Sequence, residues 1–502
     1  MTATAEPTTG AQRAAPKADV APRHPLVAVV GIGVFAFLVS VIAIATPSVW
    51  YDEAATITSA TRSWPQLWAE LQTVDAVHAI YYAFMHLVFD VFGYSPFTLR
   101  LPSAIAIGVA AAFTVVLGRQ LGRANLGIVG GLIFAVLPRT IWAGGEGRSY
   151  AITAALAVIL TVALVHAGRG EGRRPWVVYG ILVAVSCLVF MYLALIVLAH
   201  FVTIVIIAAR RRQFAPALRR PWLAAVASAG VIIAPFAFIM LAQKGQIAWI
   251  HPITWDTVTD VFVDQWFVSS SVFAIVGWTL LVLGAVTAFR SRLHHEISAV
   301  LVPLIVVPIA VLVVVSAVAF PVYVPRYLAM CLPFVALLIA AGIPAIPWRP
   351  ARLATVALIA VLALSQLIAL RAPEAKEGSA WAEVASVVDA EKTDDTAIVY
   401  GNVQLHPTAT ARVVQYAYPD AFGGTVDATV LTSAADSGRL WETRAELADS
   451  LDRIVGADQV LLITSNARDL IPSTTATLGT VGWHESERFD FTYMTIVKFE
   501  RN

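Results

Sequence analysis

The sequence predicts an all-α polytopic membrane bundle of about eleven transmembrane helices with a small C-terminal α/β domain outside the membrane. Three observations lead to this fold class. Hydrophobic residues make up 58% of the 502-residue chain and charged residues only 13%, about half of the ~25% typical of soluble domains. The charge is uneven, because residues 372–502 hold 30 of the 67 Asp, Glu, Lys and Arg. Apolar stretches of membrane-spanning length recur between residues 26 and 371.

The predicted domains follow from these stretches. Residues 1–25, rich in Ala, Pro and Thr, are expected to be a disordered N-terminus. Residues 26–371 form the transmembrane domain, and residues 372–502 the C-terminal domain. The predicted spans lie near 26–45, 101–118, 125–143, 150–167, 176–190, 193–209, 222–242, 271–289, 298–319, 327–344 and 351–371.

The orientation follows from the basic residues in alternate connections. One set of connections, including the N-terminus, holds 17 Lys and Arg, and the opposite set holds six. Because basic connections stay in the cytoplasm, the N-terminus is predicted to be cytoplasmic. An odd number of spans then places residues 372–502 on the outer side of the cytoplasmic membrane. Nine acidic residues between the spans also fall on this outer side, against four inside.

The segment 48–100 is predicted to be an outer loop with two helices in the membrane interface, at 62–73 and 76–93. A crossing helix at 76–93 would invert every later connection. The proposed aromatic anchors are Trp64, Trp68, Tyr81 and Tyr82.

The C-terminal segment has mixed α/β periodicity. It is interpreted as an accessory or stabilising domain, with acceptor recruitment as the alternative. Strands are predicted at Ala397–Tyr400, Gln459–Thr464 and Tyr493–Phe499, and helices at Ala380–Glu391 and Leu440–Ile454.

Composition excludes several classes of function. A formal net charge of +1 gives no field that would attract nucleic acid, and the apolar content excludes a soluble cytosolic enzyme. The two cysteines lie in apolar stretches, and no phosphate-binding loop or zinc spacing is present.

The strongest chemical signal is Trp50-Tyr51-Asp52-Glu53, directly after the first span. Adjacent carboxylates at a membrane surface repel one another and lose solvation, which favours a function. One of them can act as a general base while the other orients the site or holds a divalent cation. The alternative is a pair of ordinary solvated loop acids.

Three further clusters fall on the outer side. Asp75, His78 and Tyr82 share one helix face if the segment is helical, with Tyr81 beside them, and suit proton handling or hydroxyl binding. Glu146 and Arg148 lie between the third and fourth spans, where a structural ion pair is the default interpretation. Arg326 and Tyr327 open the tenth span, and arginine suits a phosphate or carboxylate. Lipid-headgroup contact is the alternative for Arg326.

An enzyme on this face needs a donor carried by a lipid, because nucleotide-activated donors are cytoplasmic. A polyprenyl-phosphate sugar fits: the lipid lies between helices and the sugar lies at the rim. A carboxylate then deprotonates the acceptor hydroxyl while a cation assists the leaving phosphate.

At these residues the chain resembles membrane glycosyltransferases of the GT-C superfamily, and in particular bacterial relatives of the dolichyl-phosphate-mannose protein mannosyltransferases (glycosyltransferase family 39). The resemblance covers roughly residues 26–345. Its ordered motifs are Asp52-Glu53, His78 with Tyr81-Tyr82, Phe92-Gly93, Arg100-Leu101-Pro102-Ser103, Glu146-Gly147-Arg148-Ser149-Tyr150 and Pro325-Arg326-Tyr327. Ala79-Ile80 replace the family's usual Pro-Pro after the histidine, and Gly147 replaces its usual Ala.

The resemblance implies an inverting transfer with Asp52 as catalytic base and Glu53 beside it. Arg326 is the candidate for the donor phosphate, and Glu146 and Arg148 shape the same rim. The layout resembles actinobacterial enzymes that act on envelope glycans, lipids or proteins. Mannose is the expected sugar. The alternatives are a polyprenyl-phosphate-arabinose-dependent arabinofuranosyltransferase, a transporter or lipid flippase, and an inactive scaffold.

Overall fold

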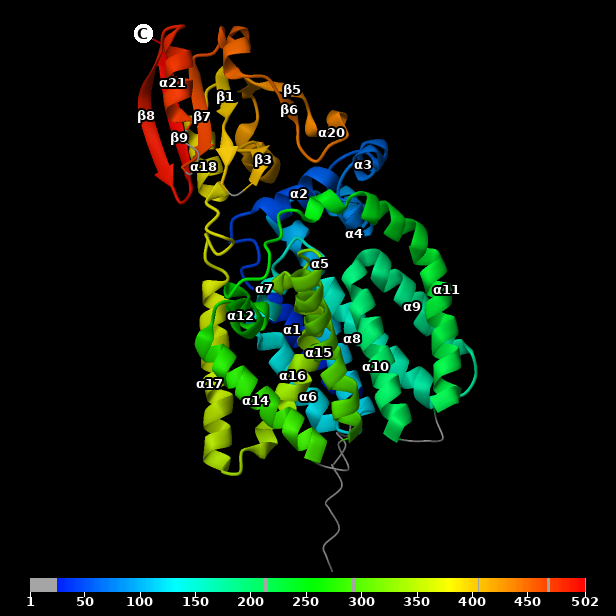
Figure 1. Cartoon of the computed structure of the whole chain (residues 1–502). Helices are drawn as coiled ribbons and strands as arrows, with labels where there is room; N and C mark the ends of the chain where they lie inside the picture. The colour runs from blue at the N-terminus through cyan, green and yellow to red at the C-terminus, as the bar shows by residue number, and fades with distance from the viewer. Residues whose placement is uncertain (1–24, 211–214, 291–294, 405, 467–469, 502) are drawn as a thin grey trace, which may run out of the picture.

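A computed structural model describes residues 25–210, 215–290, 295–404, 406–466 and 470–501. It consists of a helical bundle with a sheet-containing C-terminal domain mounted on one end (Figure 1). We call this end of the bundle the domain-bearing end. The segment predicted to be disordered, residues 1–25, lies outside the described residues except for Pro25.

Long apolar helices build the bundle. They are α1 (Pro25–Val41), α5 (Pro96–Gln120), α6 (Ala124–Val136), α7 (Pro138–Gly144), α8 (Tyr150–Arg169), α9 (Arg174–Val189), α10 (Ala194–Arg210), α11 (Ala215–Ala242), α14 (Ser271–Arg290), α15 (His295–Val318), α16 (Leu332–Gly342) and α17 (Arg349–Ala369). A 3₁₀ segment, η6 (Pro325–Cys331), leads into α16.

Eight helices in the described ranges are long and apolar enough to cross a membrane, and the bent pair α6–α7 makes nine if it counts as one span. The predicted eleven also included α1 and α9, which have only 17 and 16 residues. The predicted span 125–143 is broken by a 65° bend, because Pro138 cannot continue the hydrogen bonding of α6. The chain is thus a multi-pass membrane protein, in which some predicted spans are short or broken.

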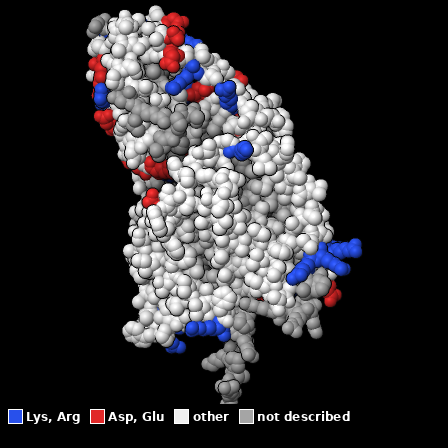
Figure 2. All heavy atoms as spheres, in the orientation of Figure 1, with Lys and Arg blue, Asp and Glu red and all other residues white. Residues whose placement is uncertain are grey.

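The surface agrees with this assignment. In the face shown in Figure 2, charged side chains gather on the C-terminal domain and towards the opposite end of the bundle, with a broad belt nearly free of charge between them. A belt of this kind suits contact with lipid, since an unpaired charge in the hydrocarbon region is costly.

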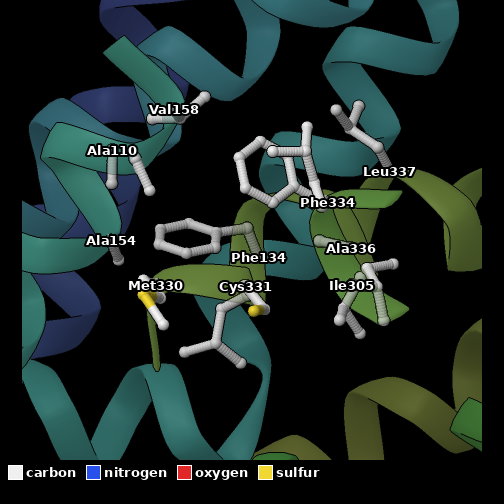
Figure 3. Packing of buried hydrophobic residues seen from close by; sticks show 14 of the residues in the cluster. Ala110, Phe134, Ala154, Val158, Ile305, Met330, Cys331, Phe334, Ala336 and Leu337 are labelled. Atoms are coloured by element: carbon white, nitrogen blue, oxygen red, sulfur yellow. The ribbon is translucent and has the colours of Figure 1, made fainter. Parts of the chain in front are cut away.

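The bundle core lies around α16, where helices from distant parts of the sequence meet. Phe134 of α6 and Phe334 of α16 pack with Met330, Cys331 and Leu337 (Figure 3), all fully buried. These side chains carry no ionised groups, so the centre of the bundle is held by close packing.

The crossing of α14 and α16 depends on two glycines. A Cβ atom on Gly284 would lie 2.0 Å from the Leu338 carbonyl oxygen, and one on Gly342 would lie 2.0 Å from that of Leu280. Small residues let membrane helices approach this closely.

Replacing Gly284 with valine is therefore expected to destabilise the protein by about 1–3 kcal/mol, the usual penalty for overpacking. Apparent melting temperature in detergent measures this loss. The matched control is Gly230→Val in α11, where a Cβ meets nothing within 4 Å. Equal melting temperatures for the two variants would contradict the close crossing.

Short helices cover the domain-bearing end. They are α2 (Tyr51–Ala60), α3 (Trp64–Leu71), the 3₁₀ turn η1 (Ala76–His78), α4 (Ala79–Phe92), α12 (Asp256–Thr259) and α13 (Gln265–Phe267). The predicted helices 62–73 and 76–93 correspond to α3 and to η1 with α4. Trp64 and Trp68 are exposed, but Tyr81 and Tyr82 are buried. The prediction that these tyrosines are interfacial anchors is therefore wrong, because they face inwards.

The C-terminal domain is a five-stranded sheet in the order β4-β1-β7-β9-β8, with two small hairpin sheets. β4, β1 and β7 run parallel, whereas β9 is antiparallel to both β7 and β8. Its strands are β1 (Thr396–Tyr400), β2 (Asn402–Val403), β3 (His406–Thr410), β4 (Val426–Asp427), β5 (Val430–Thr432), β6 (Thr443–Arg444), β7 (Gln459–Ser465), β8 (Trp483–Phe491) and β9 (Met494–Arg501). Its helices are α18 (Trp381–Glu391), α19 (Val413–Ala417), α20 (Ala434–Ser437) and α21 (Ile471–Gly479).

The three predicted strands are confirmed as β1, β7 and β9, and the helix predicted at Ala380–Glu391 is confirmed as α18. The helix predicted at Leu440–Ile454 is wrong. Thr443 and Arg444 pair with β5 instead, and only short 3₁₀ turns follow. Long-range strand pairing overrides the helical pattern there.

The C-terminal domain and the bundle share one hydrophobic cluster, which joins α2 and α4 to α18, α19, β1 and β7. Hydrogen bonds also cross the junction. Arg62 donates to the carbonyls of Arg439 and Leu440, and Tyr94 donates to that of Ala417. This continuous packing fixes the position of the C-terminal domain relative to α2.

Candidate active site

Asp52 and Glu53 lie in the first turn of α2, where the helix dipole favours negative charge. Neighbours on a helix point about 100° apart. The side chain of Glu53 accordingly points into the interior and is fully buried, while that of Asp52 keeps 14% of its surface exposed. The two carboxylates thus have different environments, and the prediction that they have different roles stays a prediction.

Glu53 is held on several sides. Arg100 of α5 donates to its two oxygens from Nε at 2.8 Å and Nη2 at 2.7 Å, and the Gly147 backbone N–H donates at 2.8 Å. Burial alone would raise the pKa of Glu53, but the charges of Arg100 and Lys376 lower it well below its ordinary value. Glu53 is therefore ionised and fixed, which suits a positioning group.

Lys376 joins Glu53 to Glu146. Its ammonium lies 3.2 Å from Glu53 Oε1, forms an ion pair with Glu146 Oε1 and donates to the Gly145 carbonyl at 2.8 Å. Trp50 Nε1 donates to the other oxygen of Glu146 at 3.0 Å. Burial raises the pKa of Glu146, and Lys376 opposes this shift. The ion pair expected between Glu146 and Arg148 is not formed, because Glu146 pairs with Lys376.

Asp52 faces Arg326, which lies at the start of η6. Arg326 Nη2 is 3.3 Å from Asp52 Oδ2, and Arg326 Nε donates to the Tyr150 hydroxyl at 3.1 Å. The guanidinium lies 5.6 Å from the ring centre of Trp50 and 5.3 Å from that of Trp249, within cation–π range. Both charged side chains remain partly exposed, so this pair is open to a ligand.

A further group of polar side chains is linked by hydrogen bonds. The Tyr82 hydroxyl donates to Asp75 Oδ2 at 2.8 Å and accepts from Arg148 Nη1 at 3.0 Å. Arg148 Nη1 also lies 3.4 Å from Thr56 Oγ1 in α2. Burial raises the pKa of Asp75, against the opposing effects of Arg148 and Tyr82. Asp75 has φ 56° and precedes η1, so it reaches Tyr82 from outside the helix.

Three polar atoms of the predicted site are buried without a hydrogen-bond partner among the described residues: His78 Nδ1, the Tyr81 hydroxyl and Arg148 Nε. Burial and the nearby Arg148 lower the pKa of His78 well below its usual value, which keeps its ring neutral. Unpaired buried polar atoms are costly. Their gathering around Arg148 is the arrangement expected of a site that binds a polar ligand.

Tyr327 belongs to an aromatic group beside Arg326. Its ring centre lies 5.0 Å from that of Tyr192, 5.5 Å from that of Phe190 and 6.1 Å from that of Tyr150. This group forms an aromatic wall next to the Asp52–Arg326 pair.

The structure thus brings all the predicted site residues to the domain-bearing end of the bundle. Asp52, Arg326 and Tyr327 are partly exposed and form the part of the site nearest the surface, which we call the opening. Asp75, Tyr82 and Arg148 are joined by hydrogen bonds, with His78 and Tyr81 beside them. Glu53 and Glu146 belong to a buried ionic network with Arg100 and Lys376. In the described part of the chain, no three His, Cys, Asp or Glu side chains gather to hold a metal ion. A divalent cation at Asp52 and Glu53 stays a prediction.

Sequence reasoning missed two cations of the ionic network. Arg100 stands out in the sequence only as part of Arg100-Leu101-Pro102-Ser103, which indicates no role for it, and Lys376 falls within the predicted C-terminal domain. A signal for Lys376 exists in its position, since it follows the last span directly, on the same predicted side as Glu53 and Glu146.

The fold and its spans define a class, the multi-pass membrane proteins, and solved structures of similar fold are known. The chain matches the crystal structure of ArnT from Cupriavidus metallidurans bound to undecaprenyl phosphate with a TM-score of 0.60, at 13% identity, over 94% of this chain and 97% of that chain. The apo state of the same ArnT matches with a TM-score of 0.57 over the same shares, also at 13% identity. An Archaeoglobus fulgidus oligosaccharyltransferase matches with a TM-score of only 0.42, at 13% identity, over 86% of this chain and 67% of that chain. No protein-family model and no curated protein matches the sequence.

Proposed function

We propose that the chain is an inverting glycosyltransferase that moves a sugar from a polyprenyl-phosphate donor to an acceptor hydroxyl. The observation that carries the proposal is the partly exposed ion pair between Asp52 and Arg326. It sets a candidate general base beside a candidate phosphate ligand at the rim of a membrane bundle. The ArnT structure of similar fold holds undecaprenyl phosphate, which supports a donor of the same chemistry here.

In the proposed reaction, the donor phosphate replaces Asp52 as the partner of Arg326, because a phosphate and a carboxylate compete for the same guanidinium N–H groups. Asp52 is then free to accept the proton of the acceptor hydroxyl. The hydroxyl oxygen attacks the anomeric carbon from the face opposite the phosphate, and the carbon–oxygen bond to the phosphate breaks. The electron pair of that bond remains on the phosphate oxygen, where Arg326 stabilises the charge.

Arg148 and its neighbours have a supporting role in this proposal. Arg148 Nε, His78 Nδ1 and the Tyr81 hydroxyl, which have no partner within the described part of the chain, supply hydrogen-bonding groups for the sugar or the phosphate. Glu53, Arg100, Lys376 and Glu146 hold α2 and the 145–149 loop in place, so that Asp52 keeps its position. We further propose that this end of the bundle faces the outside of the cytoplasmic membrane, as the basic residues of the connections indicate.

The proposal is tested with purified protein and three lipid-linked donors, carrying mannose, arabinose or glucose. We expect transfer, with mannose as the preferred sugar and arabinose as the alternative. Glycan, lipid and protein acceptors are compared in parallel, and repeating the assay with a chelator tests the predicted cation. Folded protein that transfers no sugar from any donor would refute the proposal and favour a transporter, a flippase or a scaffold.

A further inference from the structure

A pocket of about 130 Å³ lies where the bundle meets the C-terminal domain. Four chain segments line the pocket: Trp50-Tyr51 at the start of α2, Lys376 to Trp381 leading into α18, Val403-Gln404 at the end of β2, and Thr492 to Met494 at the turn from β8 into β9. Residues more than 400 positions apart in the sequence thus build one cavity. Its size is close to that of the ~150 Å³ cavity that accepts a benzene ring in an engineered protein, so it suits one six-membered ring.

The lining combines aromatic faces with hydrogen-bonding groups. Trp50, Tyr51, Trp381 and Tyr493 supply the aromatic rings, and Ser379, Gln404, Thr492 and Glu377 supply hydroxyl, amide and carboxylate groups. Gln404 Oε1 is buried and has no hydrogen-bond partner in the described ranges. An acceptor atom left unpaired in a pocket calls for a donor on a ligand.

The backbone around this pocket is strained. Glu377 has φ 54° and Tyr493 has φ 63°, a left-handed conformation that is uncommon for residues other than glycine. Gly378 has φ 72°, and a Cβ there would lie 2.6 Å from the Tyr493 ring. Such conformations cluster at ligand sites, where the surrounding structure holds them in place. Here they bring the linker and the β8–β9 turn together across the pocket.

The pocket adjoins the candidate active site. Trp50 lines it, and the same ring lies 5.6 Å from the Arg326 guanidinium. Tyr51, the next residue of the lining, directly precedes Asp52 in the chain. Burial and the charge of Asp52 raise the pKa of Glu377, and the charge of Arg326 partly opposes this shift. Glu377 is therefore close enough to interact with both Asp52 and Arg326. A ligand seated in the pocket would thus contact Trp50, the residue whose ring also lies beside the Arg326 guanidinium.

We propose that this pocket binds a sugar ring of the acceptor, so that the acceptor is a carbohydrate. This inference rests on the proposed function and adds the class of acceptor to it. A sugar ring has an apolar face of C–H groups that packs on aromatic rings, and a rim of hydroxyls that needs donors and acceptors. The lining supplies both. A peptide backbone would need extended main-chain pairing, and an acyl chain would leave Gln404 and Glu377 unpaired.

Binding is tested without relying on catalysis. Saturation-transfer NMR on the full-length protein in detergent is run with methyl mannoside, methyl arabinofuranoside, a serine- and threonine-containing peptide, and a short-chain phospholipid. We expect signal from the ring protons of at least one glycoside, reduced at least fivefold in Gln404→Leu and in Tyr493→Gly. The second variant keeps the fold, because glycine adopts φ 63° without strain. The matched control is Leu431→Ala, an exposed apolar truncation in the same domain.

Glycoside signal that is equal in wild type and both variants would overturn the proposal, as would signal from the peptide or the phospholipid alone. Kinetics then separates this inference from the proposed function. With an active donor, we expect Gln404→Leu to raise the acceptor KM about tenfold and the donor KM less than twofold. Equal changes in both KM values would refute an acceptor site. If no donor supports transfer but the glycoside signal persists, the pocket stands as a carbohydrate site and the proposed transfer fails.

Discussion

Replacing Asp52 with asparagine is expected to lower sugar transfer by about 10²- to 10⁴-fold, the usual contribution of a general base. The amide keeps the shape of the side chain and its oxygen can still accept from Arg326, but it cannot take the proton of the acceptor hydroxyl. The side chain is partly exposed, so expression and melting temperature should match those of wild type. Turnover of the lipid-linked sugar, measured at saturating donor, checks the prediction.

Asp256→Asn is the matched control for this variant. Asp256 is an exposed acid at the start of α12, on the same predicted side of the membrane, and its loss should leave transfer within about twofold of wild type. Full activity of Asp52→Asn would remove Asp52 as the base. Equal loss in both variants would show that transfer depends on the surface charge of this end as a whole.

Replacing Arg100 with methionine is expected to give the largest loss of stability, about 3–5 kcal/mol. Arg100 is fully buried and bonds both oxygens of Glu53 and the carbonyls of Ile44, Pro47 and Ser48. Methionine fills a similar volume but leaves Glu53 with Lys376 as its only charged partner in the network and three carbonyls without this donor. The start of α2 should then loosen, and transfer should fall together with the melting temperature.

The melting temperature in detergent and the transfer rate are measured on the same preparations. Arg349→Met is the control, because Arg349 is exposed at the start of α17 and its loss should change neither quantity. Arg100→Lys should fall between wild type and Arg100→Met, since lysine keeps the charge but not the planar fork. A stable and active Arg100→Met protein would show that Glu53 does not need this partner to hold α2.

These two variants separate the two neighbouring acids. Asp52 and Glu53 are both acidic and both follow the first span, so the local pattern predicts different roles for them but does not show which of the two is buried. Because neighbours on α2 point in different directions, Asp52 lies at the partly exposed Arg326 and Glu53 lies at the buried Arg100. Asp52→Asn should therefore affect chemistry without stability, whereas loss of the Glu53 partner should affect both.

Sequence alone determined the class of fold and the positions of most elements. Long apolar stretches are local features, because a spanning helix must be apolar over a few consecutive turns. The Asp52-Glu53 pair can likewise be read from neighbouring residues. The buried strands β1 and β7 were predicted for the same reason, because each contains a run of consecutive apolar residues. β8 was missed because it is largely exposed and its polar side chains give no strand signal. α6 and α7 read as one apolar run, although Pro138 breaks it.

Only the tertiary structure decided which charges meet. Lys376 lies more than 200 residues from Glu146 and more than 300 from Glu53, yet it contacts both. The predicted pairing of Glu146 with Arg148 followed from closeness in sequence, and the fold replaced it with Lys376. The pocket beside Trp50 likewise needs the C-terminal domain to close it. The physical reason is that ion pairs and pockets depend on how segments distant in the sequence come together, whereas hydropathy and helical periodicity depend only on residues close together in the sequence.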